Sequence, residues 1–171
     1  MSDNFITPSD IYEGGTKEFQ TTPPGVYAMA LAGKLQVART KDGKRKLKVF
    51  FKHTDEIAKK TYSGVNGSVL LEGLDKNGRP LVRQFADMLY ALGVSKEDAC
   101  TIANGQSDSG VIELAEIDDL PADEQWKGVE AMIQLNGDSL DLIESAVQVK
   151  VIANTYNGKT TARADAFYPT K

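Results

Sequence analysis

Two residue types on which much protein chemistry depends are almost missing from this chain of 171 residues, which has a single cysteine, Cys100, and a single histidine, His53. One cysteine excludes an internal disulfide framework and is typical of a protein from a reducing compartment. One histidine and one cysteine cannot together form a Cys/His metal site. Cys100 lies within a predicted helix, where we expect it to be buried as a small apolar residue.

Signatures of catalysis are also scarce. A Ser-His-Asp triad would have to use His53, which ends a basic stretch with no nucleophile elbow nearby. Asp118 and Asp119, with Glu113 or Glu116, could bind a divalent cation as nucleases do, but the same carboxylates also fit a solvated acidic loop. We therefore expect the protein not to be an enzyme and to need no cofactor or metal.

Long apolar runs are absent too. No stretch approaches the roughly 18 residues that a membrane-spanning helix needs, and the N-terminal MSDNFITPSDIYEGG has neither the basic nor the apolar region of a secretory signal. We expect a cytoplasmic protein with no membrane partner. The length predicts one domain, which we place at residues 23–171, after a polar N-terminal arm at residues 1–22 and with an acidic insertion around residues 106–145.

The charge that is present is unevenly distributed. The net charge is -4, yet residues 34–60 contain ten Lys or Arg and three acidic residues, whereas residues 97–144 contain thirteen Asp or Glu and one lysine. Such a split is typical of a protein with a polyanion-binding face. The alternative is a solvated surface on which the charges are merely uneven.

A first hairpin is predicted by Asp42-Gly43 between two alternating runs. The first run passes Gly33, a natural place for a bulge or bend. A two-residue loop would mix charged and apolar residues on both faces, whereas a three-residue loop at 41–43 separates them, so the pattern favours the longer loop. The predicted pairs are Thr40 with Lys44, Val37 with Leu47 and Leu35 with Val49. The apolar face comprises Leu35, Val37, Leu47, Val49 and Phe51, and the polar face comprises Lys34, Gln36, Lys44, Lys46, Lys48, Phe50 and Lys52.

The polar face of this hairpin has the pattern of a single-strand binding surface. Its lysines recur every two strand residues, about 6.6 Å apart, so that they could follow an extended phosphate backbone. Phe50, exposed among them, could stack on a base. The alternative is an edge strand that lysines protect from aggregation.

A second hairpin is predicted by Asn157-Gly158, a two-residue type I′ turn that pairs Tyr156 with Lys159. In this register Val147, Val149, Val151 and Ala153 face Tyr168, Ala166, Ala164 and Ala162. The polar face again combines aromatic and basic residues, namely Tyr156, Lys159, Arg163 and Phe167. The alternative is that these residues serve cross-strand pairing alone, as Lys150 with Asp165 would.

Between the hairpins we expect a strand at 68–74 and then two helices. The first begins near Pro80 and ends before Gly93, and Ser95 caps the second. Residues 111–117 have the composition of a strand, and residues 122–135 that of a helix around Trp126. The fold class is therefore mainly β with one or two helices inserted between the central strands.

The order of these segments resembles the single-stranded DNA-binding proteins of bacteriophages. It runs from a bent strand after PPGVY, through the basic hairpin TKDGKRKLKVFF and the helix FADMLYALGVS, to the closing VQVKVIANTYNGKTTARADAFY. The resemblance covers roughly residues 23–171 and implies a five-stranded OB-type antiparallel barrel. It further implies binding of single-stranded DNA without strong sequence preference during phage replication or recombination, with replication or recombination proteins as further partners.

The resemblance carries over to the polar faces of the two hairpins. The nucleic-acid-binding residues it implies are Lys34, Arg39, Lys44, Arg45, Lys46, Lys48, Phe50, Lys52, Tyr156, Lys159, Arg163 and Phe167. The C-terminal DAFYPTK is not an acidic tail, so any recruitment of partners by such a tail is in doubt or has moved to residues 106–145. The alternative function is a protein-interaction module, a phage-encoded modulator of a host protein that acts through this acidic segment. The oligomeric state is left open, a dimer included.

Overall fold

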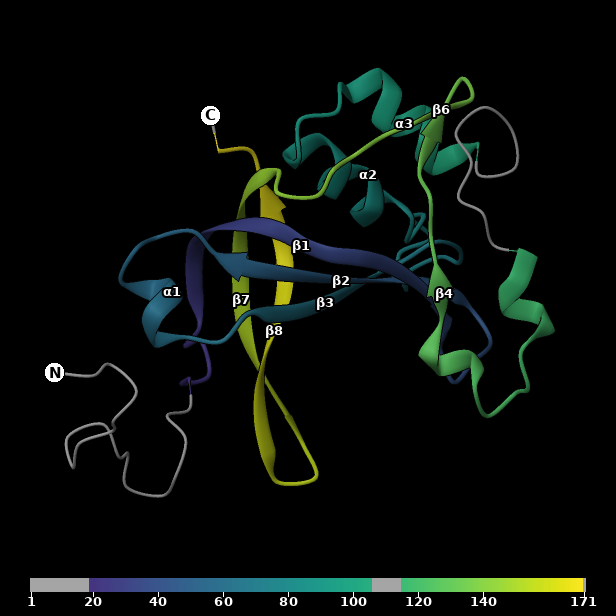
Figure 1. Ribbon diagram of the computed structural model, residues 1–171. Helices are drawn as coiled ribbons and strands as arrows, with labels where there is room; N and C mark the ends of the chain where they lie inside the picture. The colour runs from purple at the N-terminus through teal and green to yellow at the C-terminus, as the bar shows by residue number, and fades with distance from the viewer. Residues whose placement is uncertain (1–18, 106–114, 171) are drawn as a thin grey trace, which may run out of the picture.

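A computed structural model describes residues 19–105 and 115–170 (Figure 1), with the side chains of residues 115, 116 and 156 not included. Residues 1–18, most of the predicted arm, lie outside the described residues. Within the described ranges, no helix has both the length and the apolar composition needed to cross a membrane. Thr22, at the end of the predicted arm, is buried against the rest of the fold.

Five long strands form a closed ring, as expected of a mainly β protein (Figure 1). They are β1 (Gly25–Arg39), β2 (Arg45–His53), β3 (Val65–Leu70), β7 (Ala146–Tyr156) and β8 (Lys159–Tyr168). Four neighbouring pairs are antiparallel, but β3 and β8 are parallel. The expectation of a wholly antiparallel barrel is wrong at this pair. Directions cannot alternate all the way around a ring with an odd number of strands, so one pair must be parallel.

The first hairpin has the predicted loop. Thr40 N donates to Lys44 O at 2.8 Å, and Val37 lies opposite Leu47. Beyond this point β1 uses residues 33–35 where β2 uses one residue, Val49, and Gly33 has a φ of 67°. This bulge replaces the expected pairing of Leu35 with Val49. It adds two residues to β1, an even number, so the inward side of β1 is the same before and after the bulge. β2 has no extra residue here, and in it Phe51 is buried and Phe50 exposed, as predicted.

The second hairpin has the predicted turn but a different register toward its open end. Val151 lies opposite Ala164, and Lys150 lies opposite Ala166, so Asp165 is an extra residue in β8. One extra residue exchanges the two faces of a strand. Phe167 is consequently opposite Val149 and only 6% exposed, whereas Tyr168 is 42% exposed. The prediction that Phe167 lies on the polar face is wrong.

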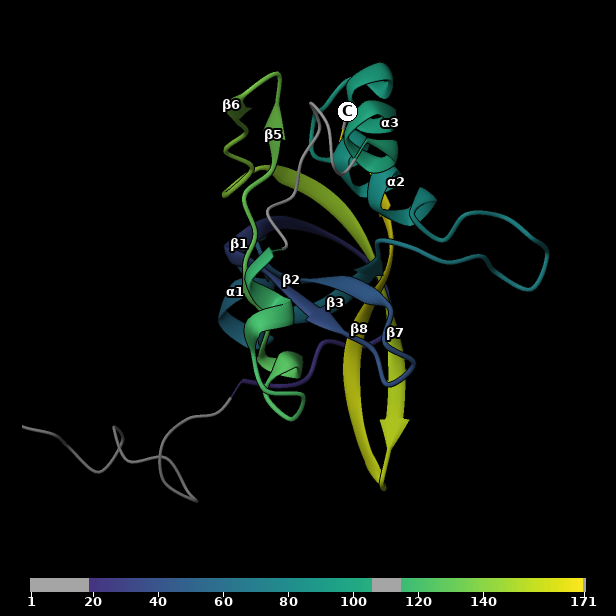
Figure 2. The same cartoon turned by 90° about the vertical axis from the view of Figure 1, so that its right-hand side faces the viewer.

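Two helices lie between β3 and β7 and cover one end of the barrel, opposite the tip of the β7–β8 hairpin (Figures 1 and 2). α2 (Arg83–Ala91) buries Phe85, Met88 and Leu89. α3 (Lys96–Asn104) begins at Ser95, whose side chain accepts a hydrogen bond from Asp98 N at 3.1 Å, as predicted. Cys100 is exposed on α3, contrary to the expectation of burial, because Ala99, Ile102 and Ala103 form the buried face of that helix.

The acidic insertion is less regular than the sequence suggested. Of the predicted strand at 111–117, the described part belongs to the 3₁₀ turn η2 (Ala115–Asp119). In place of a helix around Trp126 there is a single turn, η3 (Gln125–Lys127), followed by β4 (Val129–Glu130), β5 (Gln134–Leu135) and β6 (Asp138–Ser139). Gly128 ends the turn with a φ of 70°, a conformation that residues with side chains rarely adopt. β4 then pairs with β1. A short helix, α1 (Ala58–Thr61), connects β2 to β3.

Candidate nucleic-acid interface

The outer face of β2 carries a row of cations with one aromatic ring. We call Lys44, Lys46, Lys48, Phe50 and Lys52 the basic stripe. Within it Phe50 is 39% exposed, Lys52 is exposed, and the other lysines are half-buried. Among the residues that alternate with them in β2, Leu47, Val49, Phe51 and His53 are buried, and Arg45 is half-buried. The structure thus brings five of the predicted site residues together.

The Phe50 ring packs closely against the backbone at Gly64, where a side chain would not fit. A Cβ atom built at Gly64 would lie 2.2 Å from Phe50 Cζ. In the register of β2 and β3, Phe50 is opposite Asn66 and Lys48 is opposite Ser68, and both of these β3 residues are small, polar and exposed. No large β3 side chain therefore lies opposite Phe50 or Lys48, and the Phe50 ring is 39% exposed.

One residue of the second hairpin joins the same face. Asn66 of β3 pairs with Arg163 of β8, so Phe50, Asn66 and Arg163 form one row across three strands. Two inter-strand steps separate Phe50 from Arg163, about 9.6 Å. Arg163 is exposed, and its ion pair with Asp165 is long, with Nη2 3.9 Å from Oδ1. Lys159 lies exposed near the hairpin tip, opposite Tyr156.

The described part of the acidic insertion, residues 115–144, crosses this region; we call it the acidic segment (Figure 2). Lys34 Nζ lies 3.0 Å from Glu130 Oε1, and Lys52 Nζ lies 2.7 Å from Glu144 Oε1. Lys48 Nζ donates to the Trp126 carbonyl at 2.8 Å and lies 5.5 Å from the centre of the indole ring. The acidic segment therefore contacts three of the predicted site lysines, Lys34, Lys48 and Lys52.

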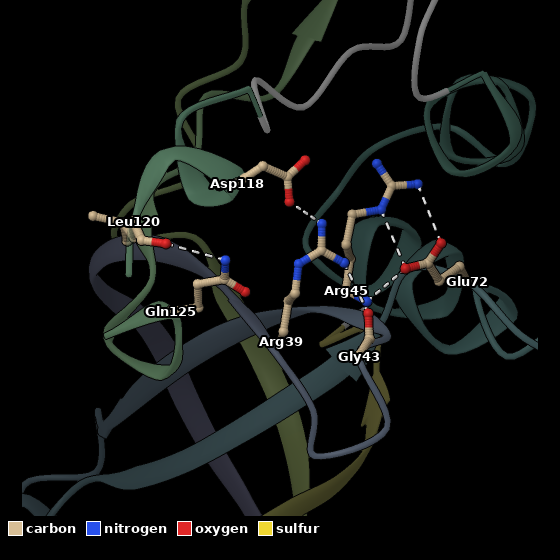
Figure 3. A network of polar contacts seen from close by, with 7 residues as sticks. All are labelled: Arg39, Gly43, Arg45, Glu72, Asp118, Leu120 and Gln125. Carbon is tan, nitrogen blue, oxygen red and sulfur yellow. Dashed lines mark hydrogen bonds and ion pairs between the residues drawn. The ribbon is translucent and has the colours of Figure 1, made fainter. Parts of the chain in front are cut away.

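Arg39 and Arg45, two of the three arginines among the predicted site residues, have other roles (Figure 3). Arg39 pairs with Asp118 and donates from Nη1 to Gly43 O at 2.8 Å. Arg45 contacts Glu72 through its backbone N at 2.6 Å and its Nε at 3.3 Å. Both arginines alternate in phase with buried residues, so the structure places them outside the basic stripe, at the end of the barrel. The hydrogen bond from Arg45 N is the main reason why the pKa of Glu72 is lowered.

The electrostatics of the stripe favour an anion. Partial burial, and then the charge of Lys48, lower the pKa of Lys46. Within the described residues Lys44 and Lys46 have no acidic partner. A phosphate near them would relieve the repulsion and replace lost hydration.

Trp126 is the contact that sequence reasoning missed. Its ring is exposed and lies near the ammonium groups of Lys48 and Lys127, at 5.5 and 5.8 Å. Its position as the sole tryptophan in an acidic stretch was a signal, but only the tertiary fold shows which lysine it meets.

The carboxylates that the sequence offered as ligands for a divalent cation do not form such a site among the described residues. Asp118 pairs with Arg39, and Glu113 lies outside the described residues. Among residues 19–105 and 115–170 no group of three or more potential ligands could hold a metal ion.

Comparison with known proteins adds no assignment to this geometry: no family model matches the chain, and no curated protein matches it.

Proposed function

We propose that the protein binds single-stranded DNA without strong sequence preference along the outer face of β2 and β3. The observation that carries the proposal is the basic stripe: Lys46, Lys48, Lys52 and the 39% exposed Phe50 lie on one face of β2, and Lys44 lies just before that strand. Arg163 lies in the same cross-strand row as Phe50. Lysines would hold successive phosphates, while Phe50 stacks on a base, a mode that is tolerant of sequence because every base has a π-face.

The topology supports an OB-type barrel as the fold. β1 pairs with both β2 and β7, β3 is parallel to β8, and the helices lie between β3 and β7. In OB folds the face of the second and third strands, with the loops at its edges, binds oligonucleotides. Here that face is β2–β3, and the flanking loops are the β1–β2 and β7–β8 turns. By the resemblance to phage proteins, the expected role is protection of exposed strands during replication or recombination.

In this proposal the acidic segment competes with DNA. A strand that follows the stripe must displace Glu144 from Lys52, and one that extends to the bulge of β1 must displace Glu130 from Lys34. Such exposed pairs are worth about 0–1 kcal/mol each. The segment therefore lowers the affinity without abolishing binding.

A second candidate function has its own supporting observation. A groove of about 490 Å³ lies between the β1 bulge and the acidic segment, and Met132 and Ile143 on its wall are exposed. An exposed apolar groove is a feature of protein-binding surfaces. This favours the protein-interaction module as the alternative to DNA binding.

Fluorescence anisotropy with a labelled oligothymidylate tests the proposal. We expect Phe50→Ala to weaken binding by about 1–3 kcal/mol, the contribution of one stacked base. Tyr90→Ala is the matched control, since Tyr90 is 40% exposed but lies on α2. With about five phosphates neutralised, log K against log salt should slope near -3.5. Lys48→Ala should reduce that slope by about 0.7.

Two results would contradict DNA binding of this kind. A salt slope near zero would mean that the lysines do not contact phosphates. Equal or tighter binding to a duplex of one fixed sequence would mean that the β2–β3 face is not the binding surface. If neither nucleic acid binds, the groove beside Met132 becomes the leading site.

A further inference from the structure

A second recess lies beyond the His53 end of β2, between that strand and α1. It measures about 740 Å³. Its aromatic and basic lining residues are Phe19, Lys52, His53, Lys59, Lys60 and Tyr62. We call it the α1 recess. Only Lys52 among these was predicted as a site residue, so the sequence pattern did not reveal it.

The charge around the α1 recess is positive. Within residues 19–105 and 115–170, no carboxylate lines it. Lys52 pairs with Glu144 and Lys59 with Glu56, both at exposed positions. Lys60 has no acidic partner in the part of the chain that the structure describes.

Beneath the recess, the buried His53 ring is held by a hydrogen bond and by two aromatic contacts. Thr22 Oγ1 donates its proton to Ser63 O at 3.0 Å, so it must accept from His53 Nε2, which lies 2.8 Å away. His53 is therefore the Nε2–H tautomer, and its ring is only 4% exposed. Burial lowers the pKa of His53 and keeps the ring neutral. The ring lies between Tyr27 and Tyr62, with centroid distances of 5.1 and 5.6 Å, and so fixes the wall that Tyr62 forms.

The α1 recess is continuous with the basic stripe. Lys52 belongs to both. Gly64 lines the recess and also supports the Phe50 ring, so the same backbone lies under the aromatic surface of the stripe and beside the recess. Phe19 lines the recess together with Lys52 of the stripe, and its ring is 57% exposed.

We propose that the α1 recess binds a further nucleotide of the same single strand, with its base against Phe19 and Tyr62 and its flanking phosphates on Lys59 and Lys60. This rests on the proposed function and extends the binding site by an aromatic-basic unit beyond the stripe. The aromatic walls would pack against a base, and a site for a simple anion would have no need of them. Lys60 would pair with a phosphate, and a purely apolar pocket would not offer such a charge.

The length dependence of binding tests this inference. Affinities of the full chain are measured for oligothymidylates of about 4 to 16 nucleotides, the range of site sizes seen for OB folds. Phe19→Ala should weaken binding of the longest oligomers by about 5- to 100-fold, as expected for one stacked base, and leave the shortest unchanged. Lys60→Ala should reduce the salt slope by about 0.7, again only for long oligomers.

Matched controls separate local effects from loss of charge or fold. Lys76→Ala removes an equally exposed lysine in the loop after β3, and Ile57→Ala removes an exposed side chain that does not line the recess. Both controls should bind every oligomer like the wild type. Melting temperatures should agree among all four variants.

The outcomes distinguish the recess from the stripe. If Phe19→Ala and Lys60→Ala match the wild type at every length while Phe50→Ala is weakened, the recess proposal is overturned and the proposed function stands. If both recess variants lose affinity equally at every length, the placement of the recess beyond the stripe is overturned. If the wild type binds no single strand, both proposals fail.

Discussion

The β1–β2 and β7–β8 hairpins are each interrupted by a bulge, but the β1 bulge adds two residues and the β8 bulge adds one. After two extra residues β1 continues with the same side of the strand inward, so it stays in phase with β2, whose basic stripe follows simple alternation. After one extra residue the faces exchange, and Phe167 replaces Tyr168 in the core. The parity of an insertion, more than its presence, decides which side chains a strand offers to a ligand.

The largest expected effect tests the first hairpin. Phe51→Ala should lower the free energy of unfolding by about 3–5 kcal/mol, because the side chain is fully buried. Phe50→Ala should cost much less, about 1 kcal/mol, since it loses only its contact with Gly64. Urea denaturation of both variants makes the comparison, and a larger loss for Phe50→Ala would mean that the faces of β2 are reversed.

Urea denaturation of variants in the second hairpin tests the one-residue bulge in β8. Phe167→Ala should cost about 3 kcal/mol, near the lower end for a buried phenylalanine, because it loses its packing on Phe51, whose ring centroid is 5.4 Å away. Tyr168→Ala should cost about 1 kcal/mol or less. If Tyr168→Ala is the more damaging change, the extra residue at Asp165 is not present and the register follows strict alternation.

A third effect would sharpen the contrast between the hairpins, because the lysines that pair with the acidic segment belong to the β1–β2 hairpin. The double change Glu130→Gln and Glu144→Gln frees Lys34 and Lys52 and should raise the affinity for oligothymidylate by about 2- to 5-fold, given the small energies of exposed pairs.

The matched control for net charge is Asp123→Asn with Asp138→Asn, two exposed carboxylates of the same segment. This pair changes the total charge by the same amount but breaks no ion pair with a lysine. We expect a smaller gain in affinity from the control. Equal gains would show that long-range charge, and not competition at the stripe, accounts for the effect.

The smallest effect concerns the end of β2, where the regular alternation of this strand places His53 inward. Because burial lowers its pKa in the folded state, the unfolded chain binds the proton more readily. The contribution of His53 to stability is present above its unfolded pKa, about 6.5, and is lost as the pH falls through the folded value. The free energy of unfolding should fall from pH 7.5 to 5.5, and His53→Gln should flatten that dependence. An unchanged slope in the variant would mean that His53 is accessible.

The sequence predicted most of the first hairpin because its turns and bulge are marked by residues that need unusual backbone angles. Gly33 and Gly43 both have positive φ. The second bulge has no such mark. Ala162, Ala164 and Ala166 fit either face, so the pattern TARADAFY is nearly as compatible with one register as with the other.

The residues of the candidate site could be predicted only in part from the sequence. The stripe follows from alternation, and the same alternation, applied to Arg39 and Arg45, places them in phase with Val37 and Leu47 and hence off the stripe. The partners of the lysines were not readable, because they come from residues about 80 or more positions away. Gly128 shows why this contact is specific to the fold: a Cβ there would lie 1.9 Å from Val37 O, so only glycine allows the acidic segment to approach β1.

The parallel pair β3–β8 has a consequence for synthesis on the ribosome. β1, β2 and β3 are synthesised first and can pair with one another. The outer edges of that three-stranded sheet stay unpaired until β7 and β8 have been synthesised. Until residue 168 has emerged, a nascent chain exposes two strand edges, including the edge of β3. Exposed edges invite pairing with other chains. Production of this protein should therefore depend on chaperones, or on rapid completion of translation, more strongly than its size alone would suggest.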